Sequence, residues 1–133
     1  MKLLALYFLT AVAFFAIDMV WIGGLAKDFY RNQIGFLMGK VNWLAAGIFY
    51  SLYIAGILYF AVFPQLKTGT WQTFLLNGAL LGLLCYATYD LTNMATLKNW
   101  PWRMVWIDLI WGMVLTGSTA VASGLIAQKW LHL

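Results

Sequence analysis

The sequence predicts an all-α integral membrane protein in which four transmembrane helices form an up-down antiparallel bundle. Three observations predict this class: 64% of the 133 residues are hydrophobic, only 9% are charged, and the mean hydropathy is +0.82. A soluble domain carries about 25% charged residues. The 8 basic and 4 acidic side chains are therefore too few to solvate the surface of so apolar a chain. The lipid bilayer is the expected environment.

Four segments are long and apolar enough to cross a bilayer, which takes about 20 helical residues. Residues 1–133 are expected to form a single domain with spans at about Leu3–Gly24, Val41–Phe63, Trp71–Leu97 and Arg103–Trp130. The first three spans end near Gly23-Gly24, Pro64 and Pro101, because these residues disfavour a continuing helix. The connections are short, which favours antiparallel packing of neighbouring helices.

The first connection mixes basic and apolar side chains in a pattern compatible with a helix. Lys27 and Arg31 alternate there with residues such as Phe29. The segment is expected either to form a helix along the membrane surface or to be an irregular loop, since Gly35 and Gly39 disfavour a helix.

The basic residues are distributed unevenly between the two sides of the predicted bundle. Five flank the first and third connections, against three on the other side. Positive charge is enriched in cytoplasmic loops, so connections one and three are expected to be cytoplasmic and both termini outside. The bases form no run or patch, and no nucleic-acid partner is expected.

Three of the four acidic residues, Asp18, Asp90 and Asp108, lie inside predicted spans. A central Asp costs about 2.5–3.5 kcal/mol on insertion scales, so such residues usually face a bundle interior, a partner or a water-filled cavity. Each lies about five to seven residues from the end of its span that faces connections one and three. At a rise of 1.5 Å per residue this is roughly 7–10 Å deep. The three carboxylates are therefore expected at one depth, and they are the main functional signal.

Aromatic and amide side chains share helix faces with these carboxylates. Asp18 and Asp108 each precede a Trp by three residues, within the similar elements Ile17-Asp18-Met19-Val20-Trp21 and Ile107-Asp108-Leu109-Ile110-Trp111. This similarity is either a chance match in an apolar chain or a sign of an inverted repeat. The candidate ligand-binding residues are Asp18, Asp90, Asp108, Asn93, Tyr86, Trp21 and Trp111.

Small residues predict where helices approach closely. The third span carries Gly78-x-x-x-Gly82, and the fourth carries Gly117, Ala120, Gly124 and Ala127 on one stripe. Small residues let helix backbones approach in lipid. These stripes either pack within the chain or form the face of a homo-oligomer.

Cysteine and histidine content excludes several kinds of chemistry. Cys85 is the only cysteine and His132 the only histidine, so the chain has no intramolecular disulfide, thiol-pair redox site, histidine-ligated haem or Ser-His pair inside the membrane. No catalytic motif is recognised, the question of enzymatic activity stays open, and no metal or cofactor is expected.

The run from Tyr86 through Asp90, Asn93 and Trp100 to Pro101 resembles the signature of a bacterial membrane-protein family, domain of unknown function 2177. The Asp18-x-x-Trp21 and Asp108-x-x-Trp111 elements look like that family too. The resemblance implies a four-span protein of the bacterial inner membrane, with genes often near lipid-modifying or light- and oxidative-stress genes.

Three functional hypotheses follow from these observations. In the first, the carboxylates form an acidic, aromatic-lined pocket for a small cation or a proton-coupled ligand. In the second, the protein is an accessory or enzymatic factor in membrane-lipid modification linked to oxidative or light stress. In the third, it is a structural membrane protein without a ligand, whose carboxylates fix helix packing through ion pairs or hydrogen bonds.

Overall fold

The computed structural model describes residues 1–133 and contains helices but no strands. Four helical segments are long and apolar enough to cross a membrane, namely Lys2–Leu25, Trp43–Gln65, Trp71–Thr96 and Trp102–Lys129. Each predicted end lies within two residues of the observed one. The all-α class and the four spans are therefore confirmed.

Five α-helices and several tighter or wider turns make up the chain. They are α1 (Lys2–Val20) with a π-helical turn over Trp21–Leu25, α2 (Lys27–Ile34), α3 (Trp43–Gly56) with π-helical turns over Ile57–Val62, α4 (Trp71–Thr96) and α5 (Trp102–Lys129). A short 3-10 turn, Gly35–Leu37, follows α2, and another, Phe63–Gln65, completes the second span. The helical interpretation of the first connection is thus correct for α2.

Helix starts follow the local sequence. The Asn42 side chain accepts a hydrogen bond of 3.1 Å from the backbone N–H of Ala45 at the start of α3. Thr70 and Thr73 form a reciprocal capping box at the start of α4. Pro101 precedes the first residue of α5, where a missing N–H costs no hydrogen bond.

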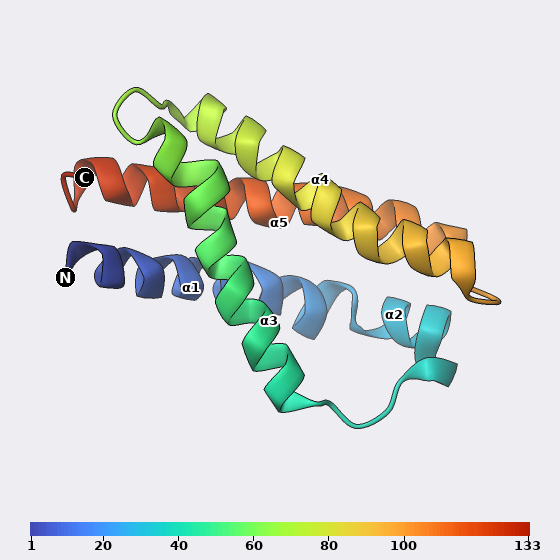
Figure 1. Cartoon of the computed structure of the whole chain (residues 1–133). Coiled ribbons are helices and arrows are strands. Elements are labelled where there is room, and N and C mark those ends of the chain that lie inside the picture. The colour runs from blue at the N-terminus through green and yellow to red at the C-terminus, as the bar shows by residue number, and fades with distance from the viewer.

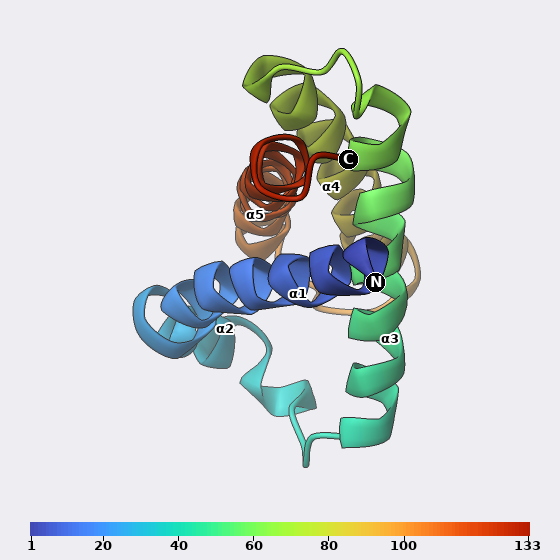
Figure 2. The same ribbon diagram turned by 90° about the vertical axis from the view of Figure 1, so that its left-hand side faces the viewer.

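The expected up-down bundle is not confirmed, because α3 crosses the other helices steeply. Figure 1 shows α1 and α4 running toward the end that holds α2, and α5 returning to the end where both termini lie. Figure 2 shows α3 upright beside α4 and α5, while α1 meets the second span near its mid-height. At this crossing Phe14 packs edge-on against Tyr50 and Tyr53, with ring centroids 5.8 Å apart in both pairs. Large rings hold the two helices apart and let α3 diverge.

Helices α4 and α5 make the most intimate contact in the molecule. A Cβ atom built on Gly82 would lie 2.0 Å from the carbonyl oxygen of Gly112, and one on Gly78 would lie 2.7 Å from the Cβ of Ala120. A Cβ on Gly124 would lie 2.4 Å from the ring of Phe74. Both predicted small-residue stripes therefore pack within the chain.

Buried hydroxyl groups join the remaining helices to α5. The Thr10 and Ser123 hydroxyls lie 2.8 Å apart and connect α1 with α5. The Tyr53 and Thr116 hydroxyls lie 2.6 Å apart and connect α3 with α5. Helix α5 is thus the element against which the other three spans are organised.

We predict that Gly82→Ala lowers the free energy of unfolding by about 1–3 kcal/mol, the usual cost of overpacking. The added methyl group meets the backbone of Gly112, which cannot rotate away. Thermal unfolding in detergent micelles, followed by circular dichroism, measures the effect. Gly47→Ala on α3 is the matched control, since its methyl group would meet nothing within 4 Å. Equal behaviour of the two variants would contradict the close contact.

Candidate functional site

The three carboxylates predicted inside the spans are all buried. Asp18 on α1 is 3% exposed, Asp90 on α4 is 0% exposed and Asp108 on α5 is 7% exposed. They come from three different helices, as the sequence analysis expected. Their hydrogen bonding differs, and this divides them into two groups.

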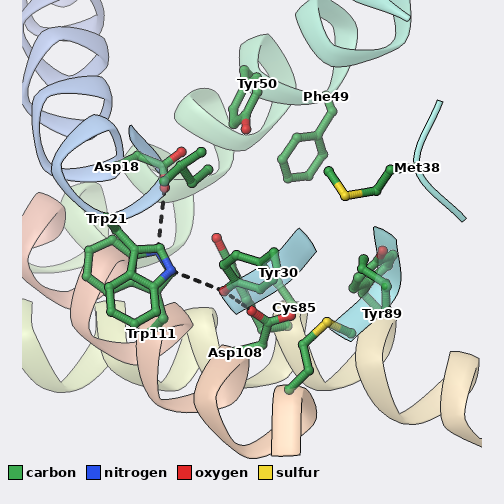
Figure 3. Close-up of a pocket in the computed structure, with 14 residues that line it drawn as sticks. Asp18, Trp21, Tyr30, Met38, Phe49, Tyr50, Cys85, Tyr89, Asp108 and Trp111 are labelled. Carbon is green, nitrogen blue, oxygen red and sulfur yellow. Dashed lines mark hydrogen bonds between the residues drawn. The ribbon is translucent and has the colours of Figure 1, made fainter. Parts of the chain in front are cut away.

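Asp18 and Asp108 are partnered by aromatic donors. The indole Nε1 of Trp111 donates to the Asp18 carboxylate at 3.4 Å. The Tyr30 hydroxyl donates to the Asp108 carboxylate and accepts a hydrogen bond of 3.1 Å from the Trp21 Nε1. Figure 3 shows this chain of contacts. Neutral donors therefore solvate both carboxylates without cancelling their charge.

The two similar Asp-x-x-Trp elements meet face to face. The rings of Trp21 and Trp111 stack with centroids 4.6 Å apart and an interplanar angle of 13°. Each Trp is hydrogen-bonded toward the carboxylate of the other element. Trp111 donates directly to Asp18, whereas Trp21 donates to Tyr30, which in turn donates to Asp108. Because α1 and α5 run in opposite directions (Figure 1), the pairing joins the two elements across the helix interface.

A cavity of about 580 Å³ opens beside these groups, where α3 diverges from the other spans. Of its 14 lining residues 12 are hydrophobic, Asp18 and Asp108 are acidic, and none is basic. The lining comprises Asp18, Trp21, Ile22, Tyr30, Ile34, Met38, Phe49, Tyr50, Cys85, Tyr86, Tyr89, Met104, Asp108 and Trp111. All four spans and the first connection contribute to it (Figure 3).

Tyr30 reaches this cavity from outside the spans. It lies on α2, which follows the π-helical turn that contains Gly23 and Gly24. Burial, together with the hydrogen bond to Asp108, raises the pKa of the Tyr30 phenol above its ordinary value. The phenol therefore stays a neutral donor at physiological pH. Sequence reasoning missed Tyr30; the available signal was its place in the helix-compatible first connection.

The candidate residues separate into a lining set and an outer set. Five line the cavity, namely Asp18, Trp21, Tyr86, Asp108 and Trp111. Asp90 and Asn93 do not line it. Asn93 is half-buried on α4, and Asp90 is enclosed with the Asp108 carboxyl group and the Trp100 indole as its neighbours.

No basic side chain is among the groups that act on the three carboxylates. Their neighbours are Trp and Tyr side chains and, for Asp90 and Asp108, each other. Ion pairs with Lys or Arg, one form of the structural hypothesis, are therefore not what holds them. No group of three or more His, Cys, Asp or Glu side chains is arranged to hold a metal ion.

Four apolar spans around buried carboxylates define a small multi-pass membrane protein. Residues 3–125 match the family described as a predicted membrane protein, DUF2177, and the chain belongs to that family. The match confirms the family that the Tyr86–Pro101 run resembles. Comparisons with curated proteins and with solved structures give no match.

We predict that Tyr30→Phe loosens α2, because it removes the donor to Asp108 and the acceptor for Trp21. An unsatisfied buried polar group costs about 1–3 kcal/mol, so trypsin should cleave faster after Lys27 and Arg31, measured by mass spectrometry of timed digests. Tyr59→Phe is the control, since Tyr59 is 67% exposed on the second span. Identical digestion of Tyr30→Phe and the wild type would show that Tyr30 does not anchor α2.

Proposed function

We propose that the protein binds a small organic cation inside the membrane, in the cavity lined by Asp18 and Asp108. One observation carries the proposal: two carboxylates face a largely aromatic cavity that has no basic lining residue. In a low-dielectric site an uncompensated negative charge is costly, and a bound cation would offset that cost. The proposal follows the first of the three hypotheses.

The chemistry of the walls favours an organic cation over a bare metal ion. Ca²⁺ takes six to eight oxygen ligands and Mg²⁺ demands near-octahedral geometry, whereas 12 of the 14 lining residues are hydrophobic. Tyr and Trp rings attract cations over their faces, and the stacked Trp21–Trp111 pair lies at the cavity wall. A positively charged nitrogen attached to an apolar body fits both parts of the site.

The size of the cavity agrees with this class of ligand. Small-molecule sites usually measure about 300–1,000 Å³, and this cavity measures about 580 Å³. Protons would compete with the cation, since protonation neutralises the same carboxylates. The proposal therefore includes release of the cation when the carboxylates are protonated, and transport of the cation by this release.

We predict that benzyltrimethylammonium binds to the purified protein in detergent, measured by isothermal titration calorimetry. Asp18→Asn and Asp108→Asn should each weaken binding at least about tenfold, because each removes a charge that faces the cavity. Asp28→Asn should bind like the wild type, since Asp28 is exposed on α2. The neutral isostere neopentylbenzene should bind much more weakly. Absence of wild-type binding, or equal weakening by Asp28→Asn, would contradict the proposal.

The same variants distinguish the two alternatives. A structural role predicts that the wild type does not bind benzyltrimethylammonium and that Asp18→Asn and Asp108→Asn lower the ligand-free melting temperature. A lipid-modifying role predicts altered lipid species, measured by mass spectrometry of membranes with and without the protein under oxidative stress. Cation binding predicts a change in affinity and an unchanged lipid profile.

We propose further that the protein lies in the bacterial inner membrane with connections one and three in the cytoplasm. This rests on the five flanking bases against three and on α2 and the α4–α5 connection lying at one end of the molecule (Figure 1). In a Cys85→Ala background, Lys67→Cys should react with an impermeant maleimide in intact cells, and Arg31→Cys only after permeabilisation. The reverse pattern would invert the topology.

A further inference from the structure

Asp90 is the one buried carboxyl group that neither lines the cavity nor has a donor. It is 0% exposed, and neither of its carboxyl oxygens accepts a hydrogen bond from a donor group. The Trp100 Nε1 beside it is also buried without a partner. A group so placed must be neutral or compensated, and no basic side chain is among its neighbours.

The packing of α4 against α5 explains why Asp90 meets Asp108. Gly82 contacts Gly112, and the two helices run in opposite directions (Figure 1). Asp90 lies eight residues after Gly82, and Asp108 lies four residues before Gly112. This register places the two acids on the same side of the glycine contact and about one helical turn apart along the interface. They are accordingly neighbours.

Two adjacent carboxyl groups in a dry site share a proton, because both cannot be ionised side by side. We infer that Asp90 carries this proton and donates it to the Asp108 carboxylate. Asp108 already accepts a hydrogen bond from Tyr30, which an anion accepts best. Asp90 accepts none, so it is the better carrier.

Asp90 is therefore a positioning residue that acts through Asp108. With Tyr30 on one side and Asp90 on the other, Asp108 has two neutral donors that orient its carboxylate and keep its negative charge available to the cavity. The role of the Asp108 charge in holding a cation rests on the proposed function. The location of the proton is independent of any ligand.

Infrared difference spectroscopy of the ligand-free protein at neutral pH tests the location of the proton. Asp90→Asn should remove a carboxylic-acid C=O band from the wild-type spectrum and leave the carboxylate bands unchanged. Asp28→Asn is the control and should remove carboxylate bands, since Asp28 is exposed. Loss of carboxylate bands in Asp90→Asn would show an ionised Asp90 and overturn the inference.

If Asp90→Asn does not fold, Asp108→Asn tests the hydrogen bond from Asp90 to Asp108. The acid band should remain and shift in frequency, because Asp90 keeps its proton and loses its anionic acceptor. An unshifted band would show that Asp90 does not donate to Asp108 and would overturn the inference.

Calorimetry of Asp90→Asn then connects the proton to the proposed function. Asparagine keeps an N–H donor where the protonated acid has O–H, so Asp90→Asn should retain benzyltrimethylammonium binding within about twofold, while Asp90→Leu should lose at least about tenfold. An intact acid band without wild-type cation binding contradicts the proposed function alone. Cation binding without an acid band contradicts the Asp90 inference alone.

Discussion

The close approach of α4 and α5 is the contact on which the rest of the molecule depends. In lipid, apolar burial contributes little to helix association, so backbones must come near enough for extensive van der Waals contact. Gly82 faces the carbonyl of Gly112 with no room for a Cβ atom, and Tyr86 packs on Gly112 from the other helix. This contact determines the register of the two helices. The same register makes Asp90 and Asp108 neighbours.

Side-chain volume determines where the molecule is tight and where it is open. Glycine and alanine bring α4 and α5 together, whereas the rings of Phe14, Tyr50 and Tyr53 keep α1 and α3 apart. The buried residues of the second span lie in its second half, from Tyr53 and Ile54 at the end of α3 to Ala61 and Val62, and Trp43 at the start of α3 is 78% exposed. The cavity opens on the diverging side of α3. Of the three rings at the crossing, Tyr50 also lines this cavity.

Composition and span length predicted the features that the bilayer alone requires. These are the four spans, whose ends were predicted to within two residues. Helical periodicity also predicted that Asp18 and Asp108 would each lie near a Trp. It could not predict that Trp111 donates to Asp18 and that Trp21 is linked to Asp108, because these pairs depend on the antiparallel contact of α1 and α5. The steep crossing of α3 depends on ring volumes at a tertiary contact. Tyr30 lies on α2, outside the spans, and its contact with Asp108 is a tertiary contact that helical periodicity does not reveal.

The choice of partners for the carboxylates is what gives the site its chemical character. A carboxylate that serves packing alone is usually cancelled by a basic side chain, since an uncompensated buried charge is strongly destabilising. Here the donors are Trp111 and Tyr30, which are neutral, and no Lys or Arg acts on Asp18 or Asp108. These donors orient the negative charge and leave it uncancelled beside an aromatic cavity. The cation of the proposed function would balance this charge.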